Sequence, residues 1–373
     1  GEWLLRAFQE QDIGWPAATG PAGTEYLALA AAHPAQVLRG EQSNTSIRFG
    51  DAIIVKLFRR LQPGVNPDEE ALRVLSMQGF AHAPAFVGSL SWLSPEGVRF
   101  PLALATSFVS HQADGWSWLL TRLRDVAAGG AIEVEPVRLL GQRTAEMHLA
   151  LASASDEAFT PEPSSSADIE QNQLRTQSGL RQATDLILEQ APTLPHAVQE
   201  SLPETLTALR LAEGQVAGYA AELGFPRIRT HGDYHLGQTL RTDDDWVILD
   251  FEGEPARPVE ERRLRASALK DVAGMLRSFA YARGASALLL PEEGRVAAES
   301  RLRKWESAAR ASFLDAYRQT IAGAGLELVP RSDEAFARAL RAWELDKALY
   351  EVAYEARNRP TWLAIPLAAL SLA

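Results

Sequence analysis

The sequence predicts an α+β fold with two lobes, a small mixed lobe built on an antiparallel sheet and a larger, mostly helical lobe. Segments with strand character are concentrated in residues 36–109, whereas helical periodicity dominates from residue 116 onward. A polar loop and a short strand, residues 231–252, interrupt the helical part. The 373 residues suffice for two such units, because single domains commonly contain about 100–200 residues. We therefore predict a first, nucleotide-binding lobe over residues 1–111 and a second lobe over residues 112–373.

Composition limits the classes of protein to which the chain can belong. Apolar residues make up 46% and charged residues 23%, as in an ordinary globular protein. No apolar run approaches the ~18 residues that span a bilayer, and no leader segment is visible, so we expect a soluble protein that does not contact a membrane. The absence of cysteine suits a cytoplasmic location. A net charge of −11 argues against nucleic acid as a partner. The sequence does not indicate an oligomeric state.

The first lobe is predicted to begin with a short cap over about residues 1–35, an aromatic stretch followed by a segment rich in Gly, Pro and Ala. A β-hairpin follows, with strand-like residues on both sides of a small polar loop. The tip residues Ser43, Asn44 and Thr45 offer backbone N–H groups and hydroxyls that can bind nucleotide phosphates. An ordinary solvated turn is the alternative.

Lys56 interrupts the apolar strand Ile53–Phe58. A lysine in a buried strand needs an anionic partner to offset its desolvation, so we predict contact with the α and β phosphates of a nucleotide. The alternative is a strand-edge lysine that extends to water. A helix is predicted from Asn66, with Pro67 and three acids in its first turns. Glu70 is the predicted partner of Lys56, unless these acids only stabilise the helix dipole at the surface.

The strand over residues 98–109 runs into the polar, glycine-containing segment Ser110–Gly115, which predicts a hinge between the lobes. In a kinase the hinge backbone binds adenine, and we assign Ser107 and Val109 to that contact. Backbone contacts place few demands on side chains, so the residue types here carry little further information.

Beyond the hinge, helices are predicted over residues 137–152, 169–190 and 202–223, with a loop at residues 156–168. His148 lies on the apolar face of the first of these helices. We predict a hydrogen-bonded core histidine there rather than a ligand, because buried polar groups normally have partners.

The segment His231–Gln238 and the strand that ends in Asp250 carry the chemistry. In phosphoryl transfer of the protein-kinase type, one Asp orients the acceptor hydroxyl, while an amide and a second Asp hold magnesium on the nucleotide phosphates. Asp233, Gln238 and Asp250 fit these three roles in this order. The ordered set therefore predicts a kinase that uses ATP and Mg2+.

Two neighbouring residues complete the predicted centre. Glu252 follows the strand and adds a carboxylate for the metal, and His235 lies close to Asp233 on the substrate side. Two histidines and an Asp within five residues could instead bind zinc, but a further set of ligands at a suitable spacing is missing from the sequence.

The chain resembles actinobacterial maltokinases and the related glucosamine kinases, within the aminoglycoside-phosphotransferase and eukaryotic-protein-kinase-like superfamily. The segments that carry this resemblance are residues 56–64, 231–238, 250–255, 269–279, 346–352 and 355–360. The resemblance implies a bilobal protein-kinase-like fold, ATP and magnesium, Asp233 as catalytic base, and Gln238 with Asp250 as metal ligands. Many members of the wider superfamily have Asn in place of Gln238. The carbonyl oxygen of Gln still reaches magnesium, with slightly different geometry.

Within this resemblance, two features favour the glucosamine kinases over the maltokinases. The amino-terminal cap is shorter than in typical maltokinases, and the hinge segment differs from theirs. A late helix over residues 343–357 adds carboxylates at helical spacing, which suit the ammonium group of an amino sugar; Arg357 and Arg359 are alternative partners for them. We assign the acceptor to Asp233, His235, Glu344, Tyr350, Glu351, Glu355 and the aromatic platform Trp362.

The predicted function is therefore an ATP-dependent sugar kinase that phosphorylates glucosamine to glucosamine 6-phosphate. The alternative acceptor is maltose, phosphorylated at its anomeric hydroxyl. An aminoglycoside phosphotransferase is a further possibility. A catalytically inert sugar- or nucleotide-binding sensor is the alternative from another class, but such proteins usually lack the base or a metal ligand, and both are present here.

Overall fold

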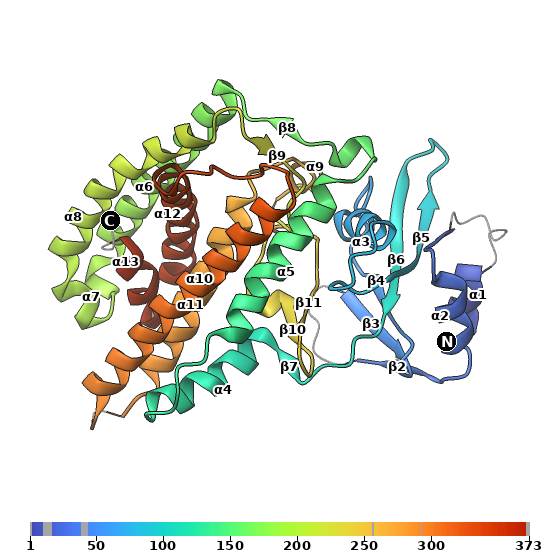
Figure 1. Cartoon of the computed structure of the whole chain (residues 1–373), viewed down its shortest axis with the longest axis horizontal. Helices are drawn as coiled ribbons and strands as arrows, with labels where there is room; N and C mark the ends of the chain where they lie inside the picture. The colour runs from blue at the N-terminus through green and yellow to red at the C-terminus, as the bar shows by residue number, and fades with distance from the viewer. Residues whose placement is uncertain (1, 10–16, 39–43, 256, 292, 371–373) are drawn as a thin grey trace.

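The computed structural model describes residues 2–9, 17–38, 44–255, 257–291 and 293–370. Its two parts confirm the predicted α+β fold. A sheet-containing lobe carries the amino terminus, and a larger helical lobe carries the carboxyl terminus at the opposite end of the molecule (Figure 1). Among the described helices, none is both long and apolar enough to cross a bilayer.

The first lobe is built on a six-stranded sheet in the order β1-β5-β6-β4-β3-β2, in which every neighbouring pair is antiparallel. Alternation along β4 directs Ile53 and Val55 to one face and Lys56 to the other. The strands are β1 (Ala17–Thr19), β2 (Ala35–Val37), β3 (Asn44–Phe49), β4 (Ile53–Phe58), β5 (Phe86–Leu93) and β6 (Arg99–Ser107).

Helices cover both faces of this sheet. On the outer face, α1 (Glu2–Gln9) and α2 (Gly23–Ala30) bury Phe8 and Leu27 against Ile53 and Val55 in a separate apolar cluster. On the inner face, α3 (Pro67–Met77) lies between the sheet and α5 (Glu135–Ala152) of the second lobe (Figure 1). The outer cluster fixes the sheet from behind, so that Lys56 faces the second lobe.

The second lobe is a set of packed helices around one large apolar core. The longest, α6, α10, α11 and α12, lie along one another and form the left part of Figure 1. The α-helices are α4 (Gly115–Ala127), α5 (Glu135–Ala152), α6 (Ser166–Gln190), α7 (His196–Glu200), α8 (Leu202–Ala212), α9 (Val259–Arg262), α10 (Leu269–Leu288), α11 (Arg295–Gly323), α12 (Asp333–Asn358) and α13 (Ala364–Leu370). Short 3-10 helices are η1 (Glu157–Phe159), η2 (Ala191–Thr193), η3 (Glu213–Glu222), η4 (Leu236–Gln238) and η5 (Pro360–Trp362).

Small sheets in the second lobe hold the segment between the lobes. The strand β7 (Ala113–Asp114) pairs with β10 (Thr239–Arg241), which also pairs with β11 (Trp246–Ile248). A further pair, β8 (Glu162–Pro163) with β9 (Pro226–Arg227), precedes the catalytic segment. The chain that leaves the first lobe is thus attached directly to the sheet that carries residues 239–248.

Candidate active site

The segment around Asp233 is held by a buried carboxylate on α10. Asp271 accepts hydrogen bonds from the backbone N–H groups of His231, at 2.7 Å, and Gly232, at 2.9 Å. Its carboxylate also lies 3.1 Å from His148 Nε2, and His148 Nδ1 lies 2.9 Å from the hydroxyl of Tyr317. The prediction of a hydrogen-bonded core histidine at position 148 is therefore confirmed. Through Asp271 this network fixes the backbone immediately before Asp233.

The imidazole of His231 connects this loop to the strand that delivers Asp250. Its Nε2 lies 2.7 Å from the carbonyl oxygen of Leu249, and its ring packs against Phe251 with 4.9 Å between ring centroids. The backbone of Gln238 adds a second connection, because its carbonyl oxygen accepts from the N–H of Leu249 at 2.9 Å. Asp233, Gln238 and Asp250 are consequently held on adjoining segments.

The Asp233 carboxylate is half-buried and lies between two nitrogen groups. Lys347 Nζ is 3.2 Å from Oδ1, and His235 Nε2 is 3.9 Å from Oδ2. Burial by itself raises the pKa of Asp233, but the opposing effect of Lys347, with smaller effects of His235 and His231, holds the pKa below its ordinary value. Burial lowers the pKa of His235. At neutral pH Asp233 is therefore a carboxylate and its histidine neighbour is uncharged.

Asp250 ends the strand in a left-handed backbone conformation, with φ of 60°. Non-glycine residues rarely adopt this conformation, and such strain is concentrated at functional sites. The side chains of Asp68, Asp250 and Glu252 each offer a carboxylate oxygen within 4.8 Å of the others. A set of hard oxygen donors of this kind fits Mg2+.

Lys56 pairs with Asp68 and Asp250, and the predicted pairing with Glu70 is wrong. Its Nζ lies 3.1 Å from Asp68 and 4.0 Å from Glu252, and it also contacts the Asp250 carboxylate directly. Burial alone lowers the pKa of Lys56, but the nearby carboxylates, Asp68 first, raise it overall. Asp68 also accepts from the N–H of Phe251 at 2.9 Å, so it joins α3 to the Asp250 segment.

Glu70 points away from Lys56 toward the second lobe, where Arg229 lies 2.7 Å and Arg263 2.8 Å from its carboxylate. Successive residues on a helix are rotated by roughly 100°. Asp68 and Glu70 therefore leave α3 in different directions, and only the first faces β4. The intervening Glu69 pairs with Arg99 at 2.7 Å.

The remaining residues assigned to the nucleotide have different positions. Asn44 and Thr45 belong to β3, where they pair with Phe58 and Leu57, rather than to a loop tip. Asn44 nevertheless lines a cavity of about 220 Å³ that Glu252 also lines. Ser43 lies outside the described residues.

Ser107 is the last residue of β6, and its hydroxyl accepts from the N–H of Ala85 at 2.9 Å. The carbonyl oxygen of Val109 accepts from the His111 ring at 2.8 Å. Ser107 thus ends the sheet of the first lobe and Val109 lies on the short connection that follows it, in the region assigned to adenine.

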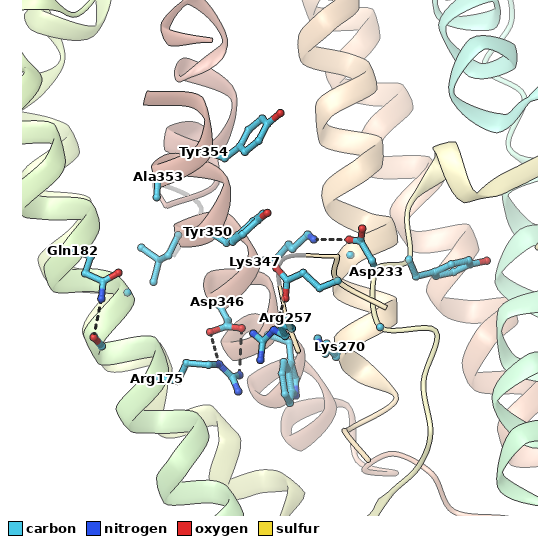
Figure 2. Close-up of a pocket in the computed structure, with 18 of the residues that line it drawn as sticks. Arg175, Gln182, Asp233, Arg257, Lys270, Asp346, Lys347, Tyr350, Ala353 and Tyr354 are labelled. Atoms are coloured by element: carbon cyan, nitrogen blue, oxygen red, sulfur yellow. Dashed lines mark hydrogen bonds and ion pairs between the residues drawn. The ribbon is translucent and has the colours of Figure 1, made fainter. Parts of the chain in front are cut away.

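A cavity of about 610 Å³ opens beside Asp233, between α6, the start of α10 and α12 (Figure 2). Its size is that of small-molecule pockets, which commonly measure about 300–1,000 Å³. On α12 the residues that line it recur at helical spacing and include Trp343, Asp346, Lys347, Tyr350 and Tyr354. The cavity is therefore large enough for a small-molecule acceptor beside Asp233.

Most of the residues predicted to bind the acceptor lie outside the lining of this cavity. Only Asp233 and Tyr350 of the predicted set line the cavity. The carboxylates instead pair with arginines: Glu344 with Arg310 at 2.7 Å, Glu351 with Arg277 at 2.8 Å, and Glu355 with Arg359 at 2.6 Å. His235 lies near Asp233 but outside the cavity lining, and Trp362 packs on Tyr281 with 6.5 Å between ring centroids. Of the two arginines named as alternative partners, only Arg359 pairs with one of these acids, Glu355, whereas Glu344 and Glu351 pair with arginines of α11 and α10.

Several cavity residues were not predicted. They are Arg175, Glu254, Arg257, Lys270, Asp346 and Tyr354. Tyr354 and Asp346 share the helical spacing of Tyr350, and this periodicity is the one sequence signal that could have identified them. The others come from α6, α10 and the segment after Glu252, and only the folded chain brings them together.

Each carboxylate that lines the cavity already has a partner. The ion pairs are Asp233 with Lys347 at 3.2 Å, Glu254 with Arg257 at 2.5 Å and Asp346 with Arg175 at 3.1 Å, and Asp271 lies 3.1 Å from the imidazole of His148. Lys270 takes part in no ion pair with a described residue, and burial lowers its pKa. The cavity wall therefore includes a half-buried cation, Lys270, that has no carboxylate partner among the described residues.

Comparisons with known proteins agree with this geometry. Residues 34–253 match the phosphotransferase enzyme family, APH. A glucosamine kinase of Mycolicibacterium smegmatis is 31% identical over 90% of this chain and 80% of its own length, and one of Streptacidiphilus jiangxiensis is 31% identical over 94% and 76%. A solved glucosamine kinase in complex with glucosamine, ADP and inorganic phosphate has a TM-score of 0.79 and 26% identity, over 99% of this chain and 81% of that one. The predicted resemblance is confirmed, and the chain belongs to the phosphotransferase enzyme family.

Proposed function

We propose that the protein is an ATP-dependent sugar kinase that transfers the γ-phosphoryl group of ATP to the 6-hydroxyl of glucosamine. The observation that carries this proposal is the position of Asp233, an ionised carboxylate that lines a sugar-sized cavity and adjoins the segment of Asp250. The similarity to proteins named glucosamine kinase over most of their length supports glucosamine as the acceptor.

In the proposed reaction, Asp233 orients the acceptor hydroxyl and accepts its proton as the oxygen attacks phosphorus. The bond between the γ-phosphorus and the bridging oxygen breaks, and ADP leaves with the electron pair. Lys56, now paired with Asp68 and Asp250, would bind the nucleotide phosphates, and the connection that contains Ser107 and Val109 would bind adenine. Asp250, Gln238 and Glu252 would hold Mg2+, which supplies positive charge against the charge that develops on the phosphoryl oxygens.

The cavity offers aromatic and polar groups suited to a sugar. Tyr350 and Tyr354 are both 46% exposed although they line it, so about half of each side chain is open to a pyranose. The cavity also has polar groups from three elements that can bind hydroxyls, among them Arg175, Lys270 and Asp346. A few placed polar groups beside apolar surface are typical of small-molecule sites.

Maltose is a second candidate acceptor, and the charge of the cavity favours it. Each lining carboxylate is already paired with a cation or histidine, and the described residues give Lys270 no ion-pair partner. A neutral acceptor is not repelled by the positive charge of Lys270, whereas the ammonium group of an amino sugar finds no unpaired carboxylate in the cavity lining. The volume of about 610 Å³ also accommodates more than one pyranose ring.

The decisive experiment measures ADP release with glucosamine, glucose, maltose and kanamycin, each over a range of concentrations with ATP and Mg2+. The proposal expects the highest kcat/KM with glucosamine, and phosphorus NMR of the product should place the phosphate on the 6-oxygen. A higher kcat/KM with maltose would replace the acceptor but keep the reaction. An Asp233→Ala variant should lose turnover and retain nucleotide binding. Equal ADP release by this variant and the wild type would refute the assigned base.

A further inference from the structure

The carboxylate of Asp233 has two inequivalent sides. Lys347 approaches Oδ1 from α12, whereas the charged group nearest to Oδ2 among the described residues is His235, 3.9 Å away. In Figure 2 the ammonium group of Lys347 and the carboxylate of Asp233 point toward one another, and a dashed line joins them. Both residues line the acceptor cavity, so the ion pair adjoins the place where the acceptor binds.

We propose that Lys347 is a positioning residue for phosphoryl transfer, which acts through Asp233 by occupying Oδ1 and leaving Oδ2 for the acceptor hydroxyl. This inference rests on the proposed kinase function and adds a residue to it. The same helix face supplies Asp346, Tyr350 and Tyr354 to the acceptor cavity. Lys347 therefore joins α12, which lines the acceptor cavity, to Asp233, which receives the proton of the acceptor hydroxyl.

The side chain of Lys347 is itself constrained on several sides. Its Nζ lies 5.2 Å from the ring centroid of Tyr350. Glu351, one turn further along α12, is buried and held by Arg277 at 2.8 Å. Asp233, Glu351 and Glu254 together outweigh the effect of burial, which is the largest single influence, and raise the pKa of Lys347. The amine consequently remains a cation throughout the range in which enzymes are assayed.

The charged groups that face Asp233 come from two elements. Lys347 belongs to α12, and the histidines 231 and 235 belong to the catalytic loop; all three lower the pKa of Asp233 against the effect of burial. Burial lowers the pKa of His235, so that ring is uncharged near neutral pH. Lys347 is thus the permanent positive charge that keeps Asp233 ionised, and an ionised carboxylate is the form that can accept a proton.

The proposed reaction needs no proton acceptor other than Asp233 and no leaving group other than ADP. The acceptor oxygen forms a bond to the γ-phosphorus, its proton passes to Oδ2 of Asp233, and ADP leaves with the electrons of the broken bond. Lys347 keeps its own protons at every stage. Its contribution is the orientation and charge of Asp233, so its removal should lower kcat and leave ATP binding unchanged.

The test compares Lys347→Met with Lys347→Arg and with the matched control Lys304→Met. Lys304 is an exposed lysine on α11 and is not among the residues that line the cavity. At pH 7, Lys347→Met should lower kcat about tenfold or more with an unchanged KM for ATP, and the acid limb of its pH–rate profile should move to higher pH. Lys347→Arg should restore the wild-type position of that limb, because the positive charge is kept. Lys304→Met should behave as the wild type.

A second readout does not depend on turnover. The carboxyl carbon of Asp233, labelled with 13C and assigned by comparison with Asp233→Asn, should titrate at higher pH in Lys347→Met than in the wild type. If the wild type phosphorylates no sugar, the proposed function fails while this titration still tests the inference. If the titration and the acid limb are both the same in wild type and Lys347→Met, the inference is overturned, whatever the acceptor is.

Discussion

Lys56 and Asp68 form an ion pair of 3.1 Å that links the central strand of the first lobe to the first turn of α3. The other oxygen of the Asp68 carboxylate accepts from the N–H of Phe251 at 2.9 Å. One buried carboxylate therefore orients the lysine assigned to the phosphates and also the backbone beside Asp250. This arrangement gives Asp68 the role that the sequence suggested for Glu70.

Asp68→Asn should weaken nucleotide use more than it weakens the fold. The amide oxygen can still accept from Phe251, but the side chain no longer neutralises Lys56. We expect kcat/KM for ATP to fall about tenfold, which corresponds to roughly 1.4 kcal/mol of transition-state stabilisation. Steady-state kinetics at varied ATP concentration measure this.

The matched control for Asp68→Asn is Glu69→Gln, a change of the next acid on the same turn. Glu69 is equally buried but binds Arg99 and Ser89, away from the catalytic segment. It should lower the midpoint of urea unfolding with little change in kcat/KM. An equal decrease of kcat/KM in the two variants would show that Asp68 affects nucleotide use only through the stability of α3, and not through Lys56.

The residues of the candidate site that could be predicted from the sequence lie close together along the chain, in a characteristic order. A loop followed by a strand and an acid specifies Asp233, Gln238 and Asp250 within a short segment, and the alternation of an apolar strand exposes Lys56 as the exception. Such signals depend on local geometry alone. They predicted phosphoryl transfer, whereas the family was predicted from the resemblance of several segments along the chain.

The acceptor side could not be predicted in the same way, because α12 carries polar residues on more than one face. Glu344, Glu351 and Glu355 repeat at helical spacing, and so do Trp343, Lys347, Tyr350 and Tyr354. Which face meets the cavity depends on how α12 packs against α6 and α10. The same is true of α3, where a rotation of roughly 100° per residue decides which of three adjacent acids meets Lys56.

Asp271→Asn should destabilise the protein and disorder the catalytic loop. Asp271 is buried and accepts two backbone hydrogen bonds while it faces His148. In Asp271→Asn an amide NH2 group replaces one of the two carboxylate oxygens that accept from the backbone N–H groups of His231 and Gly232, so two donors would face each other. We therefore expect the free energy of unfolding to fall by about 2–3 kcal/mol, the cost of losing a hydrogen bond to a charged group. Urea unfolding at pH 7 measures it.

The same residue gives a pH dependence of stability. Burial raises the pKa of Asp271, but His148, His231 and the backbone N–H of Gly232 lower it overall. A carboxylate with a lowered pKa stabilises the fold above its ordinary pKa and loses that effect as the pH falls through the folded value. The difference in unfolding free energy between wild type and Asp271→Asn should therefore shrink in acid. The control Tyr317→Phe, which removes only the far hydroxyl at His148, should cost about 1 kcal/mol with no such trend.

Lys270→Met should stabilise the fold while it changes acceptor preference. Burial lowers the pKa of Lys270, and the described residues give it no carboxylate partner, so its positive charge lowers stability at neutral pH. Replacement by Met removes this cost and should raise the urea midpoint. The same change removes a hydrogen-bond donor from the cavity, so KM for maltose and glucose should rise about tenfold, as for the loss of a charge-assisted hydrogen bond.

Glucosamine should respond less to Lys270→Met, because its ammonium group is also freed from repulsion by the lysine. The measured quantity is the ratio of kcat/KM for glucosamine to kcat/KM for maltose at pH 7, compared between wild type, Lys270→Met and the control Lys304→Met. The ratio should increase in Lys270→Met alone. An unchanged ratio with a raised urea midpoint would mean that Lys270 affects the fold but does not face the bound sugar, and the acceptor would then have to be oriented from Asp346 and Arg175 on the opposite wall.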